Sequence, residues 1–447
     1  MLARIRQLFR FLFLSSDIRN RLLITLLLLT IYRLAAHFPA PGIDREAISQ
    51  ILGSGGNTFI NLLDLLTGGT LSNFSVLAMG VYPYITAQII LNLLTPIIPA
   101  LQARMEDDPR EGRKWMEKWT YYLAVPMSLL NAIGQIRLIE QQVGGEILTF
   151  ELGLNLQSAA TLLTMMAGTM FAIWLGELIS EHGIRNQGLS LIIFAGIVSR
   201  IPGNLGQLLT VQDPTNLAIT IVALVLIMVA TILAIVYVQE GRRNVPVMYP
   251  GRRVGNRMSM PVKGTLPLRV NMAGMIPLIF AQSLLTFPGI IAGFFIRSET
   301  AWISNVAAWV SENFSGQGPA WWILFFFMVV GFTFFYTDVL FAQQNYGENL
   351  KRSGAQIPGV TKGAPTQRYL TRVLRRITLP GALFLGLVAI MPFIISLLPF
   401  WSAGQNTGLL LVSSSGLLIV VGVVRDLYRA IEAELKLRGY DSAVLVR

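Results

Sequence analysis

Apolar residues are arranged along this chain in long continuous runs, and polar and charged residues gather between the runs. Ten runs have about 20 residues each, the length that an α-helix needs to cross a hydrocarbon layer of roughly 30 Å. The runs do not show the alternation of apolar and polar positions that is typical of membrane barrel strands. We therefore predict ten transmembrane helices, at 20–38, 75–97, 119–138, 155–178, 189–208, 217–239, 270–292, 319–341, 377–398 and 408–426.

The composition supports the same fold class. Hydrophobic residues make up 53% of the 447 residues and charged residues only 13%, whereas about 25% of the residues of a soluble protein are charged. We therefore predict an all-α polytopic membrane protein. Of the 35 Lys and Arg residues, 30 fall on the side of the ten-helix topology that holds both termini. Because basic residues mark the cytoplasmic side, we expect both termini to be cytoplasmic.

The first residues, "MLARIRQLFRFLFLSS", have a basic start and an apolar run, as a signal peptide does. The run is short, however, no cleavage site with small residues follows, and Arg19 and Arg21 come next. We expect residues 1–19 to form an amphipathic helix on the cytoplasmic membrane surface.

The chain lacks the residues that several kinds of active site need. It has no Cys and only two His, His37 and His182, which argues against thiol chemistry and a structural zinc cluster. There is no Gly-Lys pair for a phosphate-binding loop. We therefore expect no enzymatic activity, no cofactor and no metal ion. The ionisable residues within the apolar runs, such as Glu177 and Asp338, lie toward span ends, which indicates a passive conduit or scaffold.

Two loops on the predicted cytoplasmic side are strongly basic. Residues 240–269 contain seven basic residues and one acid, Glu240, and residues 341–377 contain seven basic residues and one acid, Glu348. One interpretation is that these charges only set the membrane topology. The other is that the loops bind an acidic partner, such as ribosomal RNA or the negatively charged face of a protein.

The segment before the second span, "FINLLDLLTGGTLSNF", is apolar but interrupted by Asp64, Gly68 and Gly69. It is too short to cross a bilayer and lies on the predicted outer side. The two glycines provide a hinge, so a re-entrant or interfacial hairpin is one interpretation of this segment.

Several stretches of the chain resemble the SecY family of protein-conducting channels. They are "RLAAHFPAPGID", "LLTGGTLSNFSVLAMGVYPYITAQIILNLL", "GLSLIIFAGIVSRIPG", "LPLRVNMAGMIPLIFAQS", "NLKRSGAQIPG" and "GLLIVVGVVRDLYRAIEAELKLRGY", in the family's order. The resemblance implies two inverted halves of five helices around an hourglass pore in a bacterial cytoplasmic membrane. The halves would be residues 20–208 and 209–426, followed by a cytoplasmic tail, 427–447. The implied function is to pass unfolded secretory polypeptides across the membrane and to release transmembrane segments sideways into lipid.

The resemblance also implies three groups of site residues. A plug helix at about 58–74 would seal the resting pore, with the residues Phe59, Leu62, Leu63, Asp64, Leu65, Leu66, Gly68 and Gly69. The pore ring would be Val81, Ile85, Leu189, Ile193, Ile279 and Ile419. Within it, Val81 with Ile85 and Leu189 with Ile193 are spaced to share a helix face. Asn92 and Asn271 match polar positions on a lateral gate, where the second and third spans part from the seventh and eighth; hydrogen bonding between helices is the alternative for these two residues.

The partners implied by the resemblance are the small membrane subunits SecE and SecG, the motor SecA, the ribosome, polypeptides with signal sequences and the lipid bilayer. The expected docking residues are Arg242, Arg243, Arg252, Arg253, Arg257, Lys351, Arg352, Lys362 and Arg368. The family usually has Arg at the position of Thr361 and Pro at that of Lys362, and an ammonium group does not reproduce the hydrogen bonds of a guanidinium.

Two other functions fit the pattern of spans. A secondary transporter with inverted repeats would share the fold, but it would usually have a charged site near the middle of the membrane. An insertase-like scaffold without a pore is the second alternative, and water access to engineered Cys residues from both sides would argue against it.

Overall fold

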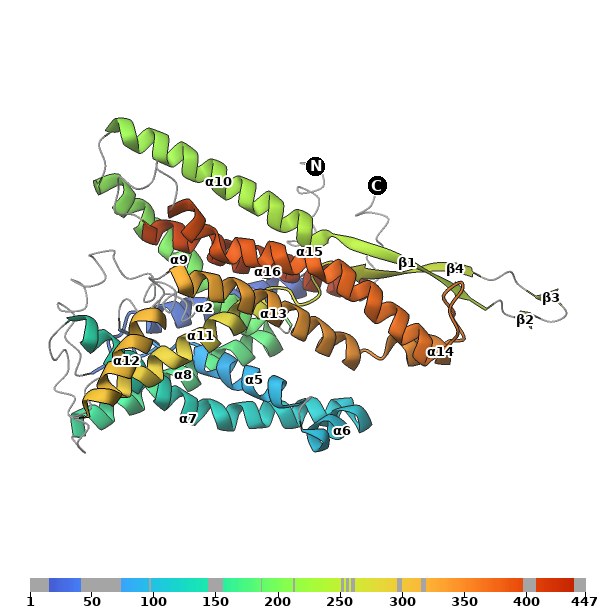
Figure 1. Cartoon of the computed structure of the whole chain (residues 1–447), viewed down its shortest axis with the longest axis horizontal. Helices are drawn as coiled ribbons and strands as arrows, with labels where there is room; N and C mark the ends of the chain where they lie inside the picture. The colour runs from blue at the N-terminus through green and yellow to red at the C-terminus, as the bar shows by residue number, and fades with distance from the viewer. Residues whose placement is uncertain are drawn as a thin grey trace.

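The computed structural model describes residues 16–41, 74–95, 98–143, 156–185, 187–211, 214–250, 253–254, 257–258, 262–295, 300–314, 319–396 and 407–437. This part of the chain is mostly helical (Figure 1). The predicted N-terminal helix, 1–19, lies outside it except for its last four residues, which belong to the first described helix.

The helices pack side by side in an elongated bundle (Figure 1). They are α2 (Ser16–Ala35), α5 (Tyr82–Leu94), α6 (Pro99–Asp107), α7 (Pro109–Val143), α8 (Leu156–His182), α9 (Gly188–Val211), α10 (Pro214–Glu240), α11 (Ile276–Phe295), α12 (Ala301–Phe314), α13 (Pro319–Gln343), α14 (Tyr346–Arg352), α15 (Ala364–Ser396) and α16 (Thr407–Leu437). Four strands accompany them: β1 (Arg242–Tyr249), β2 (Arg253–Val254), β3 (Arg257–Met258) and β4 (Val262–Arg269).

Ten of the described helices overlap the ten predicted spans in order, and the shorter α6, α12 and α14 lie between spans. By length and hydropathy, three helical segments of the described chain could cross a membrane: Ser158–His182, Ala320–Arg352 and Ala364–Ile395. A fourth is possible if Tyr82–Leu94 and Pro99–Met105, which meet at a bend of 100°, form one span. The polytopic helical fold is therefore confirmed, and the count of ten spans stays a prediction.

Two predicted spans begin too early. The second was placed from residue 75, but residues 75–81 form turns and α5 begins at Tyr82. The seventh was placed from residue 270, but α11 begins at Ile276. In both helices the second residue is a proline, Pro83 and Pro277, and proline favours the first turn of a helix because its missing N–H has no partner there. Apolar composition alone does not distinguish such turns from helix.

The basic segment 240–269 forms a β-ribbon that hydropathy did not predict. Strands β1 and β4 pair antiparallel, with Arg242 opposite Arg269 and Tyr249 opposite Val262. Val245 and Val247 are buried, whereas Asn244 and Pro246 are exposed, so one face of β1 is covered. The ribbon, α6 and α14 lie at one end of the bundle and α12 at the other (Figure 1).

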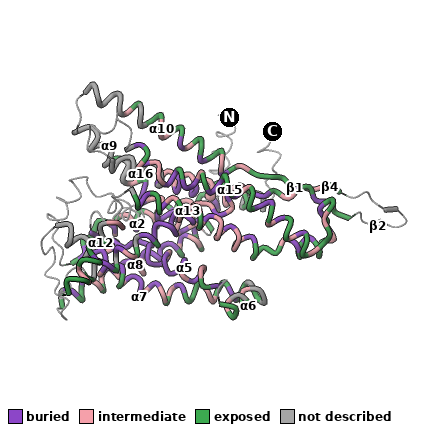
Figure 2. The backbone as a smooth tube through the Cα atoms, in the orientation of Figure 1, coloured by how far each residue is buried: buried purple, intermediate pink, exposed green. Residues whose placement is uncertain are grey.

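Contacts between the two halves of the chain join specific helices. Helix α9 packs on α16, α7 packs on α11, and α5 touches α11. Buried residues are concentrated inside the bundle, whereas the described parts of α10 and α12 contain many exposed residues (Figure 2). The buried interior therefore includes the junction between the halves.

Candidate functional site

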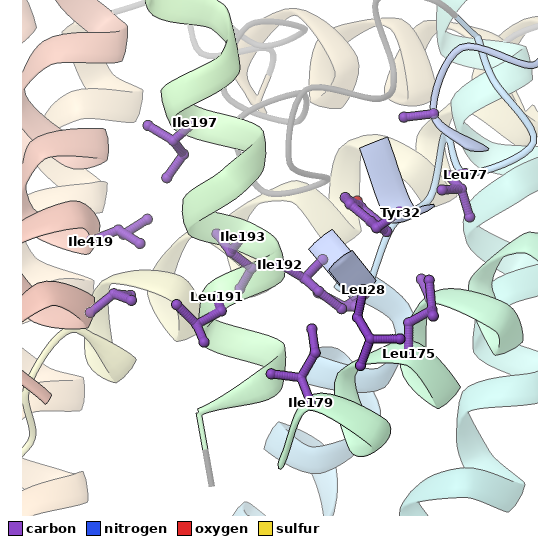
Figure 3. Close-up of a cluster of buried hydrophobic side chains, with 14 of the residues drawn as sticks. Leu28, Tyr32, Leu77, Leu175, Ile179, Leu191, Ile192, Ile193, Ile197 and Ile419 are labelled. Atoms are coloured by element: carbon purple, nitrogen blue, oxygen red, sulfur yellow. The ribbon is translucent and has the colours of Figure 1, made fainter. Parts of the chain in front are cut away.

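A large apolar cluster joins α2, α8 and α9 to α16, and we call it the junction cluster. Its buried members come from α2, the turns before α5, α8, α9 and α16: Leu28, Tyr32, Ala36, Leu77, Val81, Ala172, Leu175, Ile179, Ile184, Leu191, Ile192, Ile193, Ile197, Ile419 and Val423. In Figure 3, Ile419 approaches α9 from one side, and Leu28 and Tyr32 approach it from the other. The chain thus joins helices that are distant in sequence through aliphatic contacts.

The structure brings the six predicted ring residues into two adjoining clusters. Four of them are buried, with exposed fractions of 5% or less, and Ile85 and Leu189 are half-buried against the junction cluster. Ile279 packs with Tyr82 in a smaller cluster. Ile85 and Met275 pack against both clusters and so connect them.

Close packing of α8 on α9 positions the start of α9. A Cβ atom on Gly188 would collide with the carbonyl oxygen of Gly176, so only glycine allows this approach. The backbone N–H of Gly188 also donates to the hydroxyl of Ser180 over 3.1 Å. Leu189, the next residue, is therefore held beside α8 and next to the junction cluster.

The predicted plug, 58–74, lies outside the described residues except for Phe74. Phe74 is buried and has a φ of 41°, which is unusual for a residue with a side chain. Its carbonyl accepts the N–H of Ala40 over 3.0 Å, and the N–H of Val76 donates to Phe38 over 2.9 Å. These bonds join the residues that flank the segment 42–73, and Leu77 of the junction cluster follows Phe74 by three residues.

The two predicted gate residues have different surroundings. Asn271 was expected within a span, but it precedes α11 and closes a turn. Its amide donates to the carbonyl of Gly274 over 3.0 Å and accepts the N–H of Gly274 over 2.9 Å, and Gly274 has a φ of +67°. The interpretation of Asn271 as a polar residue within a helix is therefore wrong, because its amide stabilises a turn. Asn92 is half-buried in α5.

Four buried polar side chains on α7 and α11 were missed. They are Asn131, Gln135, Gln282 and Ser283, each at most 6% exposed, and the two helices that hold them are in contact. Within the described residues, the amides of Asn131 and Gln135 and the hydroxyl of Ser283 have side-chain atoms without a hydrogen-bond partner. Polar groups without a partner destabilise an apolar interior. The sequence signal that could have identified these residues is the occurrence of Asn, Gln and Ser within the apolar runs, in "NAIGQ" and "AQS".

The two basic loops fold together as one unit, which we call the loop module. It consists of β1, β4, the segment 341–363 with α14, and the beginning of α15. Met248 and Gln356 exchange backbone hydrogen bonds of 2.8 and 2.9 Å, which join the ribbon to the second loop. Its core is formed by Val245, Val247, Leu268, Phe341, Leu350, Ala355, Ile357, Leu370, Val373 and Leu374. The module therefore has a hydrophobic core separate from the junction cluster.

The predicted docking residues lie on the outside of the loop module. Exposed side chains are those of Arg242, Arg243, Lys351, Arg352, Lys362 and Arg368. Arg253 lies in β2 and Arg257 in β3, but only their backbone is described, and Arg252 lies outside the described residues. At the tip, Thr361 and Lys362 are both exposed between Gly359 and Gly363, whose φ angles of +79° and +89° favour glycine.

Charged residues gather where the ribbon leaves the helical body. Burial lowers the pKa of Arg269, and the neighbouring cations Arg429 and Arg425 lower it further. Glu240 and Asp426 act in the opposite direction. These five residues therefore include three cations and two anions, and the two acids reduce the repulsion between the arginines.

The two histidines are not placed for metal binding. His37 Nδ1 lies 2.8 Å from the carbonyl oxygen of Arg33, and His182 is exposed beside Glu181. Among the described residues, no three His, Asp or Glu side chains are grouped to hold a metal ion.

The comparisons with known proteins agree with one another. The family model SecY matches residues 75–428. The Protein translocase subunit SecY of Streptomyces griseus is 36% identical over 443 residues, which cover 96% of this chain and 97% of that protein. The subunit of the same name from Aquifex aeolicus is 36% identical, and the match covers 97% of this chain and 98% of that protein. The subunit from Halalkalibacterium halodurans is 37% identical, and the match covers 96% of this chain and 97% of that protein.

Solved structures show the same fold. One, described as "The structure of a protein conducting channel", has a TM-score of 0.61 and 16% identity and covers 95% of this chain and 93% of that chain. A second concerns the plug domain of a SecY protein, and it has a TM-score of 0.59 and 17% identity over the same shares.

Proposed function

The chain belongs to the SecY family, and from that premise we propose that it forms the pore of a protein translocase, which passes unfolded polypeptides across a membrane. Family membership favours this function over a secondary transporter or a scaffold without a pore. It also supports a bacterial cytoplasmic membrane as the location, with ten spans and both termini in the cytoplasm.

The observation that carries the proposal is the packing of six aliphatic side chains at the junction of the halves. They come from α9, α11, α16 and the region around the start of α5. A pore for polypeptides of any sequence cannot depend on specific hydrogen bonds at its waist. An apolar collar that excludes water when empty meets this need, so we assign Val81, Ile85, Leu189, Ile193, Ile279 and Ile419 to the pore ring.

The plug role of the segment 58–74 is part of the same proposal. Support comes from the described residues on either side of the segment 42–73, which the backbone bonds of Ala40 and Val76 join next to Leu77 and Val81. The two glycines Gly68 and Gly69 allow it to bend.

A lateral gate lies between α5 and α7 on one side and α11 and α13 on the other. The contacts of α5 and α7 with α11, which form a seam between these helices, support this position of the gate. The buried polar groups of Asn131, Gln135 and Ser283 weaken the packing of the helices that hold them, because they lack partners among the described residues. A seam with such groups opens at lower cost than a purely aliphatic one.

The partners are those of the family. SecE and SecG would complete the membrane complex, and SecA or the ribosome would bind the loop module through its exposed basic residues. The ribbon and the second loop form one unit, so a partner would meet their charges together. Polypeptides with signal sequences are the substrates, and no cofactor is required.

Reconstitution tests the proposal. The chain is placed in proteoliposomes with SecE and SecG from the same source, and SecA, ATP and a polypeptide with a signal sequence are added outside. We expect the polypeptide to become protected from protease, and a substrate without its signal sequence to stay accessible. Equal protection of both substrates, or of neither, contradicts the proposal.

A further inference from the structure

A cavity of about 550 Å³ lies between α13 and α15, outside the junction cluster. Its apolar wall contains Phe334 and Leu379, and its basic wall contains Arg368, Arg372, Arg375 and Arg376. Apart from Arg368, none of these residues has a role in the function proposed above.

The arginines give the cavity a strong positive charge. Asp338 pairs with one of them, since Arg375 donates to it from Nε over 3.1 Å and from Nη2 over 2.8 Å. No ion pair joins Arg368, Arg372 or Arg376 to an acid among the described residues. Three exposed guanidinium groups within three turns of one helix repel one another, and an anion between them would relieve this repulsion.

One neutral donor, the side-chain amide of Gln367, lies among the arginines. Gln367 accepts the backbone N–H of Gly347 through Oε1 over 2.8 Å, which leaves its NH₂ group as a donor. Gln367 lines the cavity, as does Thr371, whose hydroxyl already donates to the carbonyl oxygen of Gln367 over 2.9 Å. Guanidinium and amide donors together fit the oxygens of a phosphate group.

An apolar surface continues from the cavity along α15. Leu379, Leu383 and Leu387 follow at intervals of four residues and are 49%, 41% and 50% exposed, so they share one face of the helix. Arg375 stands one turn before Leu379 on that face. Exposed apolar side chains next to arginines are typical of a helix at the boundary between lipid and water.

We propose that this cavity binds the phosphate of an anionic phospholipid, with the acyl chains along Leu379, Leu383 and Leu387. The arginines supply the charge complementarity, and the leucines provide a surface that a soluble anion would not use. A nucleic acid or an acidic protein would not contact this apolar face. Asp338 competes with the phosphate for Arg375 and so limits the affinity.

Lipid retention in nanodiscs tests the proposal. The full chain with its membrane subunits is reconstituted in phosphatidylcholine containing a small fraction of phosphatidylglycerol, and the lipids bound to the released protein are counted by native mass spectrometry. The double variant Arg372→Gln/Arg376→Gln should bind phosphatidylglycerol about 30-fold more weakly, or about 2 kcal/mol at 1.4 kcal/mol per tenfold. The matched control, Arg110→Gln/Arg113→Gln on α7, should retain it as the unmodified chain does.

A third variant changes the affinity in the opposite direction. Asp338→Asn frees Arg375 and should increase the retention of phosphatidylglycerol severalfold. Inorganic phosphate alone should not displace the lipid, because it cannot use the leucine face. The proposal is overturned if inorganic phosphate displaces the lipid, or if the control variant loses as much phosphatidylglycerol as the arginine variant does. It is also overturned if the arginine variant and the Asp338 variant both retain phosphatidylglycerol as the unmodified chain does, or if the unmodified chain retains phosphatidylcholine as well as phosphatidylglycerol.

Discussion

Arg429 of α16 donates a hydrogen bond from Nη2 to Oε1 of Glu240, the last residue of α10, over 2.6 Å. Glu240 also lies 3.5 Å from Arg242, the first residue of β1. One carboxylate thus connects the start of the ribbon with a helix from the end of the chain. The nearby Arg269 and Arg425 make this the place where the loop module is electrostatically fixed to the body.

The first prediction concerns Glu240. Glu240→Gln removes the negative charge between Arg242 and Arg429, so the neighbouring cations repel one another. Because the side chains of Arg429 and Glu240 are 28% and 42% exposed, we expect the free energy of unfolding to fall by only roughly 0.5–1 kcal/mol. Hydrogen exchange of the β1 and β4 amides should become faster. Glu348→Gln, which removes an exposed pair with Arg352, is the control and should leave ribbon exchange unchanged; equal effects would contradict the role of Glu240.

The second prediction concerns the core of the loop module. Ile357 is 2% exposed and lies one residue after the backbone bonds between Met248 and Gln356. Ile357→Ala leaves a cavity and should destabilise the module by about 2–5 kcal/mol. Limited proteolysis should then cut the ribbon sooner while the helical body stays intact. Pro358→Ala, at the exposed neighbouring position, serves as the control. If the ribbon of this variant is also cut faster, the loss of the buried Ile357 side chain is not the cause of the faster cleavage.

The third prediction concerns the pore ring. Ile419→Asn or Ile279→Asn introduces a polar group at the apolar waist and should let water and ions enter it. We expect higher ion conductance of the resting complex in planar bilayers and export of substrates with defective signal sequences. Val388→Asn places the same amide in a different buried cluster and should not raise conductance. If both ring variants conduct as the unmodified chain does, the ring is misplaced.

The fourth prediction concerns movement between the halves. Tyr82 and Ile279 form one buried cluster across the α5–α11 contact. The chain has no Cys, so Tyr82→Cys/Ile279→Cys would form a single bond between the halves. Oxidation, or a short bifunctional thiol reagent, should block export, and reduction should restore it. Each single variant, treated in the same way, provides the control. Export that persists after complete cross-linking would rule out opening at this seam.

The fifth prediction concerns partner docking. Lys351→Glu/Lys362→Glu reverses two exposed charges of the loop module, so an acidic partner surface should be repelled. Translocation driven by SecA should fall strongly, while the amount of the chain in the membrane stays the same. Arg110→Glu/Arg113→Glu, on the exposed start of α7, tests whether any reversal of positive charge has this effect. Normal translocation by the first variant would refute docking at these residues.

Part of the site could be predicted from the sequence because the signals were local. The long apolar runs indicated the helices, and the spacing of Leu189 with Ile193 indicated a shared face of α9. Val81 was expected on the same helix face as Ile85, but it is the residue before α5, and its carbonyl accepts the N–H of Ile85 over 3.1 Å. The assignment of all six residues to a ring came from the resemblance of the quoted stretches to a known family, and no spacing supported Ile279 or Ile419. The structure brings all six into adjoining clusters, whereas their role in the pore stays a prediction.

Other features depend on contacts between residues far apart in the chain. The same apolar composition occurs in the turns at 75–81 and in the helix that follows, so backbone geometry rather than hydropathy decides where α5 begins. Asn271 looked like a polar residue inside a span, but its amide closes a turn on Gly274.

The sequence by itself determined the class of this protein: a chain with long apolar runs, few charges and basic loops must place its helices in a membrane, because unpaired backbone groups cannot be exposed to lipid. Only the tertiary structure decided that the two basic loops share one core, that Arg429 reaches Glu240, and that arginines and leucines of α15 border one cavity with α13. The physical reason is that hydropathy is a property of each segment, whereas burial and charge pairing arise when distant segments pack together.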